Sequence, residues 1–310
     1  MEPITYFVTL NWNTTGLLEK MVESVEATTP EPHRWIILDN GSTNEEVIAL
    51  FDFAHRAFGN FIIMGACEEP RLWGENLSRL QTAIIGSQVN LGCIVGHNLA
   101  LDVAQAWGDG QPHQVVLIDT DVVVTEEGWL SKVLKWADAR PGVGIVGMEH
   151  GPNAVCAPAV FLDTNGNWYL HQSQMEQAEP AEGESVGLGF ALVRRPVLEA
   201  GLRFDTNYQM YYKQDDDLCF QARLDLGLEV WVYPVGCVHY GSGSLKANEY
   251  QVGEASGWDE FDQVKQANQA YFVKKWRRAL GDRRRNMAEQ AAWLQERKVE
   301  NRARKVGSRE

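Results

Sequence analysis

Short apolar segments that end in polar residues alternate with amphipathic segments along the first half of the chain. The apolar segments are rich in β-branched and aromatic residues and are predicted as strands at 4–10, 35–38, 61–64, 115–118 and 142–147. Helical spacing of apolar residues recurs between them, at 16–27, 45–58 and 126–138. Such alternation predicts an α/β fold with a Rossmann-like, mostly parallel sheet flanked by helices.

Three of these predicted strands end at a polar residue, namely Asn11, Asp39 and Asp119. Ligands of open α/β sheets bind beyond the carboxyl ends of the strands. We therefore expect these three side chains to converge on one crevice.

The second half of the chain has a different pattern. Strands are predicted at 155–162, 185–195 and 229–240, and the polar, acidic stretch 163–184 is predicted as a loop. Helical signals dominate after Tyr250, with one or two helices expected between Asp259 and Arg304. No internal repeat is evident.

Composition narrows the class of protein. No apolar run approaches the roughly 20 residues that span a bilayer, and the first 13 residues lack the pattern of a signal peptide. Five cysteines (67, 93, 156, 219 and 237) form no CxxC pair, which indicates free thiols rather than a disulfide framework or a zinc site. We expect a cytoplasmic protein without a transmembrane segment.

Charge divides the chain into an acidic body and a basic tail. Residues 1–270 hold 15 Lys and Arg against 37 Asp and Glu, a net charge of −22, whereas residues 271–310 hold 13 against 5, a net charge of +8. The two parts are therefore expected to have different roles.

Asp119 and Asp121 stand one residue apart at the end of an apolar run, in IDTDVVV. Side chains at positions i and i+2 of a strand point the same way, so the two carboxylates can share Mg²⁺ or Mn²⁺, which are commonly completed by substrate phosphates. An ordinary solvated turn is the alternative.

Other polar motifs follow strands or begin helices. Asp39, in LDNGST, can accept hydrogen bonds from a nucleobase or a ribose, or can simply form an Asx turn. Asn90 and Gly92, followed by a helix predicted to open at Gly96–Asn98, offer backbone N–H groups to a phosphate, or are simple turns.

The segment QDDDL at 214–218 places Asp215, Asp216 and Asp217 at the start of a predicted helix. One or two acidic residues would suit the helix dipole, but three exceed that need, and their mutual repulsion favours a general base or a cation-binding group. His239, in HYGSGS, is either a buried structural histidine or a metal ligand facing Asp119 and Asp121.

In order, these motifs resemble the nucleotide-sugar transferases of glycosyltransferase family two, and within it the rhamnosyltransferase-like branch. The matching segments are LNWNT, LDNGSTN, NLGCIVGHN, IDTDV, GFALVRRPVLEAGLRFD, QDDDL and HYGSGS, which span about residues 4–244. The resemblance implies a GT-A fold over residues 1–250, with a nucleotide-sugar half at about 1–125 and an acceptor half at about 126–250. Residues 251–310 would form a helical, basic C-terminal extension.

The resemblance also implies roles for single residues. Asp215 would be the catalytic base, and Asp121 and His239 would bind Mn²⁺ or Mg²⁺, with Asp119 contacting the metal, its water or the donor sugar. The donor nucleotide would meet Asp39, Asn11, Asn90, Gly92 and Asn98. Gly189, Asp216 and Asp217 would lie on the acceptor side.

Two residues depart from the family pattern. Gln214 replaces the usual Glu of the EDxDL motif, and Asn44 replaces the Asp that ends GSTD. Neither removes a group that the chemistry needs. The segment 65–88 is longer than expected between strands and would shape a pocket particular to this chain.

The leading hypothesis is an inverting, metal-dependent glycosyltransferase that moves a sugar from a nucleoside-diphosphate-sugar to an acceptor hydroxyl. A sugar-1-phosphate nucleotidyltransferase is disfavoured because LNWNTTG lacks the basic residues of its phosphate-binding loop. A catalytically inactive sugar-nucleotide or glycan-binding protein is the alternative of another class.

The acceptor is left open, as a glycan, a lipid-linked saccharide or a nucleic acid. The basic tail, with KKWRR and RRR, admits three interpretations: a solvated helical extension or oligomer contact, a peripheral contact with anionic lipid at the inner membrane face through Trp276 and Trp293, or a grip on DNA whose hydroxylated bases would be the acceptor.

Overall fold

A computed structural model describes residues 4–66, 80–108, 113–150, 160–162, 165–170, 179–240 and 257–281. The predictions that concern most of segment 65–88, residues 155–159, most of 163–178, the GSGS of 241–244 and the tail beyond residue 281 lie outside the described residues.

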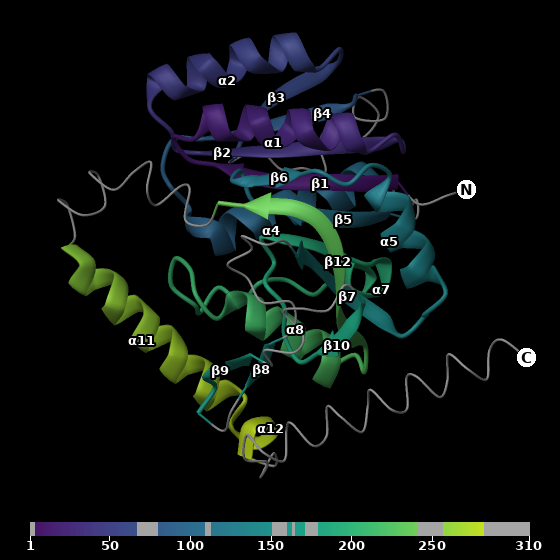
Figure 1. The fold of residues 1–310 in the computed structure, drawn as a ribbon. Coiled ribbons are helices and arrows are strands. Elements are labelled where there is room, and N and C mark those ends of the chain that lie inside the picture. Colours follow the sequence, from purple (N-terminus) through teal and green to yellow (C-terminus); the bar gives the residue numbers. More distant parts are fainter. Residues whose placement is uncertain are drawn as a thin grey trace, which may run out of the picture.

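The first half alternates strands and helices as predicted (Figure 1). Thr43 caps α2 by accepting a hydrogen bond from the backbone N–H of Glu46, and acidic Glu45 and Glu46 begin this helix while His55 and Arg56 end it, which complements the helix dipole. The elements are β1 (Ile4–Asn11), α1 (Thr15–Thr28), β2 (His33–Asn40), α2 (Asn44–Ala57), β3 (Phe61–Gly65), β4 (Thr82–Ser87), α4 (Gly92–Gly108), β5 (His113–Ile118), β6 (Val122–Val124), α5 (Trp129–Asp138) and β7 (Val143–His150).

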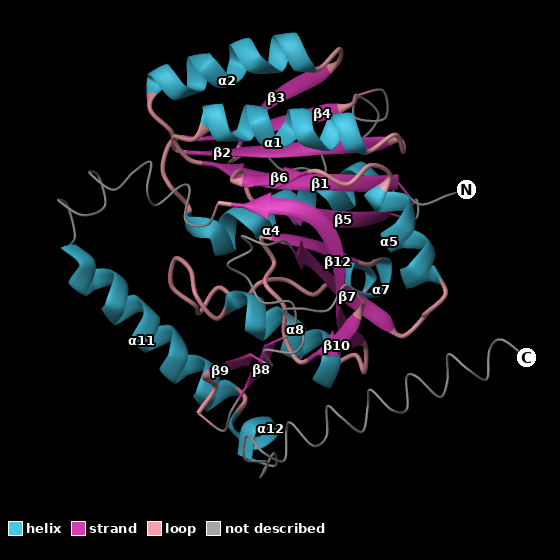
Figure 2. Cartoon of the chain, in the orientation of Figure 1, coloured by secondary structure: helices cyan, strands magenta, loops and turns pink. Residues whose placement is uncertain are grey.

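Among the described residues, the second half adds four short strands, the long strand β12 and three further helices before the C-terminal α12 (Figure 2). These elements are β8 (Val160–Leu162), β9 (Trp168–Leu170), β10 (Ala181–Gly183), β11 (Phe190–Val193), α7 (Arg195–Glu199), α8 (Gln214–Leu224), β12 (Glu229–His239), α11 (Gly257–Lys275) and α12 (Arg277–Gly281). No helix in these described ranges combines the length and the apolar character needed to cross a membrane.

One mixed sheet organises the described chain, in the order β10-β12-β7-β11-β5-β1-β2-β4-β3, with β6 added against the end of β12. The pairs around β1 are parallel, as are β3 with β4 and β7 with β12, whereas β11 runs antiparallel to both of its neighbours. The mostly parallel α/β sheet predicted from the alternation is therefore confirmed.

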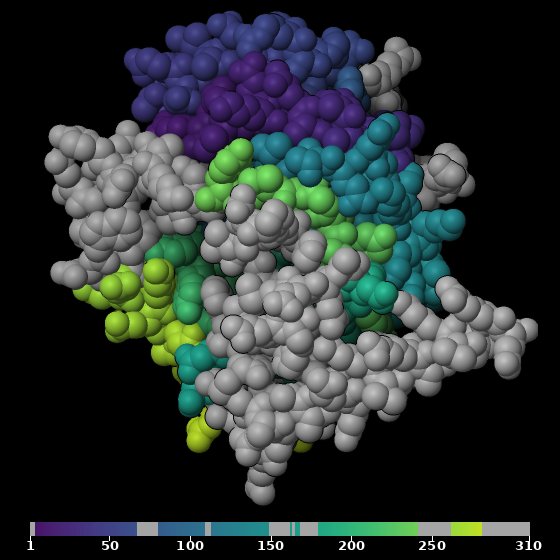
Figure 3. All heavy atoms as spheres, in the orientation of Figure 1, coloured from purple at the N-terminus to yellow at the C-terminus, as the bar shows by residue number. Residues whose placement is uncertain are grey.

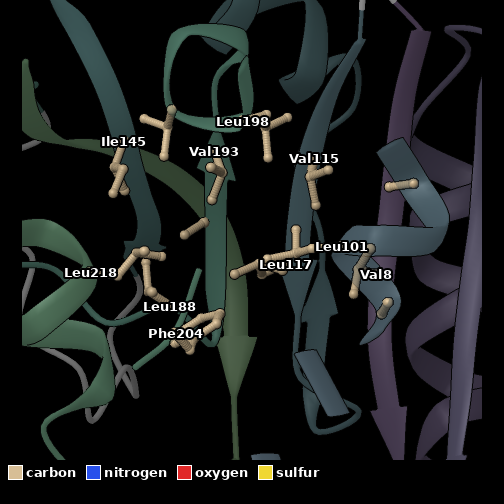
Figure 4. Packing of buried hydrophobic residues seen from close by; sticks show 14 of the residues in the cluster. Val8, Leu101, Val115, Leu117, Ile145, Leu188, Val193, Leu198, Phe204 and Leu218 are labelled. Atoms are coloured by element: carbon tan, nitrogen blue, oxygen red, sulfur yellow. The ribbon is translucent and has the colours of Figure 1, made fainter. Parts of the chain in front are cut away.

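Helices cover both faces of the sheet because successive strand residues face opposite sides. In β1, Tyr6 and Val8 belong to the core beneath α4, α7 and α8, whereas Phe7 packs on the other side with residues of α1, α2 and α5. Figure 4 shows the first of these cores, where Leu101 of α4, Leu198 of α7 and Leu218 of α8 approach residues of the sheet.

The structure corrects several predicted boundaries. Strand β4 lies within the stretch 65–88, for which the sequence predicts one long connection, and β9 and β10 interrupt the predicted loop 163–184. These strands are six, three and three residues long, too short for a clear periodic signal. In the stretch 185–195 only Phe190–Val193 is a strand, and α5 begins at Trp129 rather than at 126.

Candidate active site

Asn11 and Asp39 are direct neighbours at the carboxyl ends of β1 and β2, which pair in parallel with these two residues in register. Both side chains are buried, and the Asn11 amide donates to Asp39 Oδ1 at 3.3 Å. This arrangement follows from the alternating sequence, since two parallel strands of matched length bring their polar ends together.

Hydroxyl groups that the sequence reasoning missed complete this corner. The Thr14 hydroxyl donates to Asn11 Oδ1 at 3.0 Å and lies 3.3 Å from the hydroxyl of Thr120. Thr120 is the residue between the two aspartates in the IDTD sequence. The backbone N–H of Ser42 points to Asp39 Oδ2 at 3.4 Å. Their position directly after predicted strands is the only sequence signal for these residues. Single Ser and Thr residues are so common in turns that this position does not identify them as site residues.

The Asp39 carboxyl has a raised pKa. Burial is the main cause, and hydrogen bonds from Ser42 and Asn11 oppose it only in part, while the charge of Glu46 adds to the rise. A carboxylate kept partly desolvated in this way is a stronger hydrogen-bond acceptor for a ligand that enters the site.

Asn40, also missed, organises the neighbouring loop. Its Nδ2 donates to Asn90 Oδ1 at 3.0 Å, and its Oδ1 accepts from the backbone N–H of Leu91 at 2.8 Å. Asn90 Oδ1 also accepts a hydrogen bond from the backbone N–H of Gly92 at 2.8 Å. Gly92 is the first residue of α4 and has a left-handed backbone conformation, with a φ of 75°. The predicted donor residues Asn90 and Gly92 are thus fixed beside β2 through Asn40.

The predicted phosphate-binding start of α4 needs correction, because the helix begins at Gly92 and not at Gly96. Gly96 lies within the helix, where a Cβ atom would come within 2.7 Å of the Leu10 and Leu38 side chains, so this glycine allows the helix to pack on the sheet. The Asn98 amide donates to the carbonyl of Phe204 and accepts from its N–H, both at 2.8 Å. The amide N and the amide O of Asn98 therefore both bond to the protein backbone.

Asp119, Asp121 and His239 form a group in which one potential ligand atom of each residue lies within 4.8 Å of the others. The topology creates it, because β6 pairs with the end of β12 and places His239 opposite Val122. Asp121 and His239 are buried, with Asp121 Oδ1 3.1 Å from His239 Nε2, whereas Asp119 is exposed. Two carboxylates and one imidazole fit Mn²⁺ or Mg²⁺, and the exposed Asp119 leaves the group open toward a ligand.

A two-residue segment connects this group to the QDDDL helix. The carbonyl of Gly189 accepts from the backbone N–H of Asp119 at 2.7 Å, and the N–H of Leu188 donates to Asp215 Oδ2 at 3.2 Å. The thiol of Cys93, at the start of α4, has a pKa raised by burial and by the negative charges of Asp215 and Asp119. Asp215, Asp119 and the start of α4 thus lie around one region.

The other two aspartates of QDDDL face the interior. Asp216 accepts from Ser185 Oγ at 2.5 Å and from Lys213 Nζ at 2.9 Å. Asp217, fully buried, accepts from Tyr208, Gln221, Lys275 and Trp276 at 2.7–3.0 Å. Internal hydrogen bonds thus occupy the carboxylates of Asp216 and Asp217, and Asp215 and Gly189 stay the predicted residues on the acceptor side.

Comparisons with known proteins identify the type of fold. No family model matches the sequence, and no curated protein matches it significantly. Among solved structures, the mannosyltransferase PcManGT from Pyrobaculum calidifontis, in complex with GDP-Man and Mn²⁺, is 14% identical with a TM-score of 0.51, covering 96% of this chain and 81% of that chain.

A second structure, GalNAc-T7 with UDP, GalNAc and Mn²⁺, is 12% identical with a TM-score of 0.54. The match covers 88% of this chain and 55% of GalNAc-T7, so the chain spans about half the length of that protein. These likenesses show that the chain has the GT-A fold, as the sequence resemblance implied. The narrower assignment to family two and its rhamnosyltransferase-like branch stays a prediction.

Proposed function

We propose that this chain is an inverting, metal-dependent glycosyltransferase that uses a nucleoside-diphosphate-sugar as donor. The observation that carries the proposal is the group of Asp119, Asp121 and His239, joined to Asp215 through Leu188 and Gly189, on a GT-A fold. The two similar structures were solved with Mn²⁺ and with GDP-Man or UDP, which supports the same class of donor here.

Each part of the site has a role in this proposal. Asp39, held by Asn11, accepts hydrogen bonds from the nucleobase, and the loop of Asn90 and Gly92 lies beside it. Asp121 and His239 would hold Mn²⁺ or Mg²⁺, with Asp119 at the open side. When bound, the ion would supply positive charge that stabilises the departing nucleoside diphosphate.

Asp215 is the proposed general base. Its carboxylate takes the proton of the acceptor hydroxyl while that oxygen forms a bond to the anomeric carbon. The bond from the anomeric carbon to the diphosphate oxygen breaks at the same time, and its electron pair leaves with the nucleoside diphosphate. Attack opposite to the leaving group inverts the anomeric configuration. The N–H of Leu188 orients the carboxylate for this transfer.

Asp39→Asn is expected to weaken binding of the nucleoside diphosphate about ten- to a hundredfold, since hydrogen bonds to charged groups are worth about 1.5–3 kcal/mol. Calorimetric titration with UDP and GDP in the presence of Mn²⁺ measures this effect. Asp52→Asn, an exposed aspartate of α2, is the matched control and should bind like the wild type. Equal affinity in Asp39→Asn would refute the nucleobase role.

The same variant should not lose stability. The raised pKa of Asp39 means that the folded protein binds a proton there more readily than the unfolded chain, so the ionised carboxylate disfavours folding at neutral pH. Asp39→Asn is therefore expected to unfold at an equal or higher temperature than the wild type at pH 7. The difference should shrink as the pH falls through the pKa of folded Asp39, which thermal scans across the acidic range measure.

A donor screen tests the function itself. The purified chain is incubated with common UDP-, GDP- and dTDP-sugars with Mn²⁺, Mg²⁺ or EDTA, and release of the nucleoside diphosphate is measured. We expect release from at least one donor, dependent on the metal, and inversion at the anomeric carbon by NMR of the product. Metal-dependent donor binding without any release would instead favour the inactive sugar-nucleotide-binding protein.

The class of the acceptor and the role of the basic tail are proposed from the sequence alone. Salt-dependent binding of DNA and of anionic vesicles by the full chain distinguishes a nucleic acid from a lipid-linked acceptor. A chain ending at residue 281, which keeps KKWRR but lacks RRR, shows which of the two basic clusters carries the binding. Binding to neither DNA nor vesicles would favour the solvated extension or oligomer contact and a soluble glycan acceptor.

A further inference from the structure

The loop Gln209–Lys213, directly before the QDDDL helix, has an unusual backbone. Three residues with side chains adopt positive φ angles, Met210 at 47°, Tyr212 at 81° and Lys213 at 69°. Left-handed backbone is unfavourable for residues with a Cβ atom, so a loop of this kind persists where its surroundings determine it.

The surroundings are provided by Asn268 of α11, a side chain that is 1% exposed. Its Nδ2 donates to the carbonyls of Gln209 at 2.8 Å, Tyr211 at 2.6 Å and Tyr212 at 3.2 Å. Its Oδ1 accepts from the N–H of Gln209 at 2.9 Å. One side chain thus binds the backbone of most of the loop.

The contact continues along one face of α11. The ring of Phe272, one turn after Asn268, lies 5.3 Å from the buried ammonium of Lys213. Lys275 and Trp276, a further turn on, donate to Asp217 at 2.9 and 2.7 Å. Positions 268, 272, 275 and 276 share one helix face, and they meet residues 209–212, 213 and 217 in the same order. Figure 1 shows α11 next to α8, and Figure 3 shows residues of α11, in yellow-green, at the molecular surface.

The clamped loop also contacts the candidate active site. The carbonyl of Met210 accepts from the thiol of Cys93 at 2.7 Å and from its backbone N–H at 3.3 Å, at the start of α4. Asp215 lies between two points that α11 holds, Lys213 and Asp217. A shift of the loop is therefore expected to displace Asp215 relative to Leu188 and the metal-binding group.

We propose that Asn268 is a positioning residue, which holds the loop Gln209–Lys213 and thereby sets the place of Asp215 for proton transfer. This inference rests on the proposed function for the role of Asp215. The loop clamp itself is independent of that function.

The test compares Asn268→Ala with Gln266→Ala in the full chain. Gln266 is an exposed amide side chain of the same helix α11, so its replacement controls for the loss of an amide group on this helix. Asn268→Ser, which retains a shorter hydroxyl donor, replaces Asn268→Ala where that variant does not fold.

The first measurement is amide hydrogen exchange of peptides covering residues 205–217. Exchange is expected to be at least about tenfold faster in Asn268→Ala and unchanged in Gln266→Ala. Exchange at the wild-type rate in the Asn268 variants would overturn the clamp, whether or not the protein is an enzyme.

The second measurement is the kcat of metal-dependent donor hydrolysis, divided by the number of sites that bind UDP or GDP with Mn²⁺. This normalisation removes the effect of a smaller folded fraction. Asn268→Ala is expected to lower kcat per site about ten- to a hundredfold, since displacements near 1 Å cost rates of this order, while KM for the donor stays within about twofold. An unchanged kcat per site would overturn the positioning role. A wild-type protein that hydrolyses no donor would refute the proposed function, and the exchange measurement would still decide the clamp.

Discussion

Asp215→Asn is expected to lower the rate of sugar transfer or donor hydrolysis by about 10²–10⁴, the usual contribution of a general base. The substitution keeps the shape of the side chain and an oxygen that can accept from the N–H of Leu188, so the start of α8 should remain in place. Affinity for UDP or GDP with Mn²⁺ is expected to stay within about twofold of the wild type. Steady-state rates and calorimetric titration measure the two effects separately.

The matched control is Asp225→Asn, an exposed aspartate at the other end of the same helix. It should leave both the rate and the affinity unchanged. Wild-type turnover in Asp215→Asn would remove the base assignment. A parallel loss of nucleotide binding would instead show that Asp215 acts on the donor rather than on the acceptor hydroxyl.

The sequence allowed the sheet and its polar strand ends to be predicted because both depend on local patterns. Asn11 and Asp39 each follow a run of apolar residues, and parallel pairing of two such strands leaves few ways to arrange their ends. The GT-A fold was predicted from seven ordered motifs, and the structural comparisons support it although no family model matches.

Roles within the QDDDL motif could not be read from the sequence. Three adjacent aspartates are similar in chemistry, and a helix turns each of them by about 100° from the last. Asp216 and Asp217 therefore point into the interior, where Lys213 and Lys275 neutralise them, while Asp215 faces Leu188. The partners of Asp217 lie as far as 59 residues away, so only the fold identifies them.

The roles of Asn40 and Asn268 could not be predicted either, because they too depend on contacts between elements that are distant in the sequence. Each is a single asparagine whose value depends on backbone groups brought to it by other elements, Leu91 for Asn40 and the loop Gln209–Lys213 for Asn268. Asn98, by contrast, was selected from a family motif. Its side chain pairs with the backbone of Phe204, more than 100 residues away, which a motif does not reveal.

Asp121→Asn is expected to abolish the stabilisation of the protein by Mn²⁺ and to reduce metal-dependent turnover by at least about a hundredfold. If the wild type binds Mn²⁺ at this group in the folded state alone, the ion at a hundred times its Kd would stabilise the folded state by about 2.7 kcal/mol. Asp121 is the buried carboxylate of the group and lies next to His239. Its replacement by Asn therefore removes a negatively charged ligand from the buried side of the proposed metal site. Asp119→Asn should have the smaller effect on metal affinity, since Asp119 is exposed. Thermal unfolding with and without Mn²⁺, in the presence of UDP or GDP, compares both variants with Asp52→Asn. Equal Mn²⁺ stabilisation in Asp121→Asn and Asp52→Asn would mean that the ion, if bound, is held elsewhere.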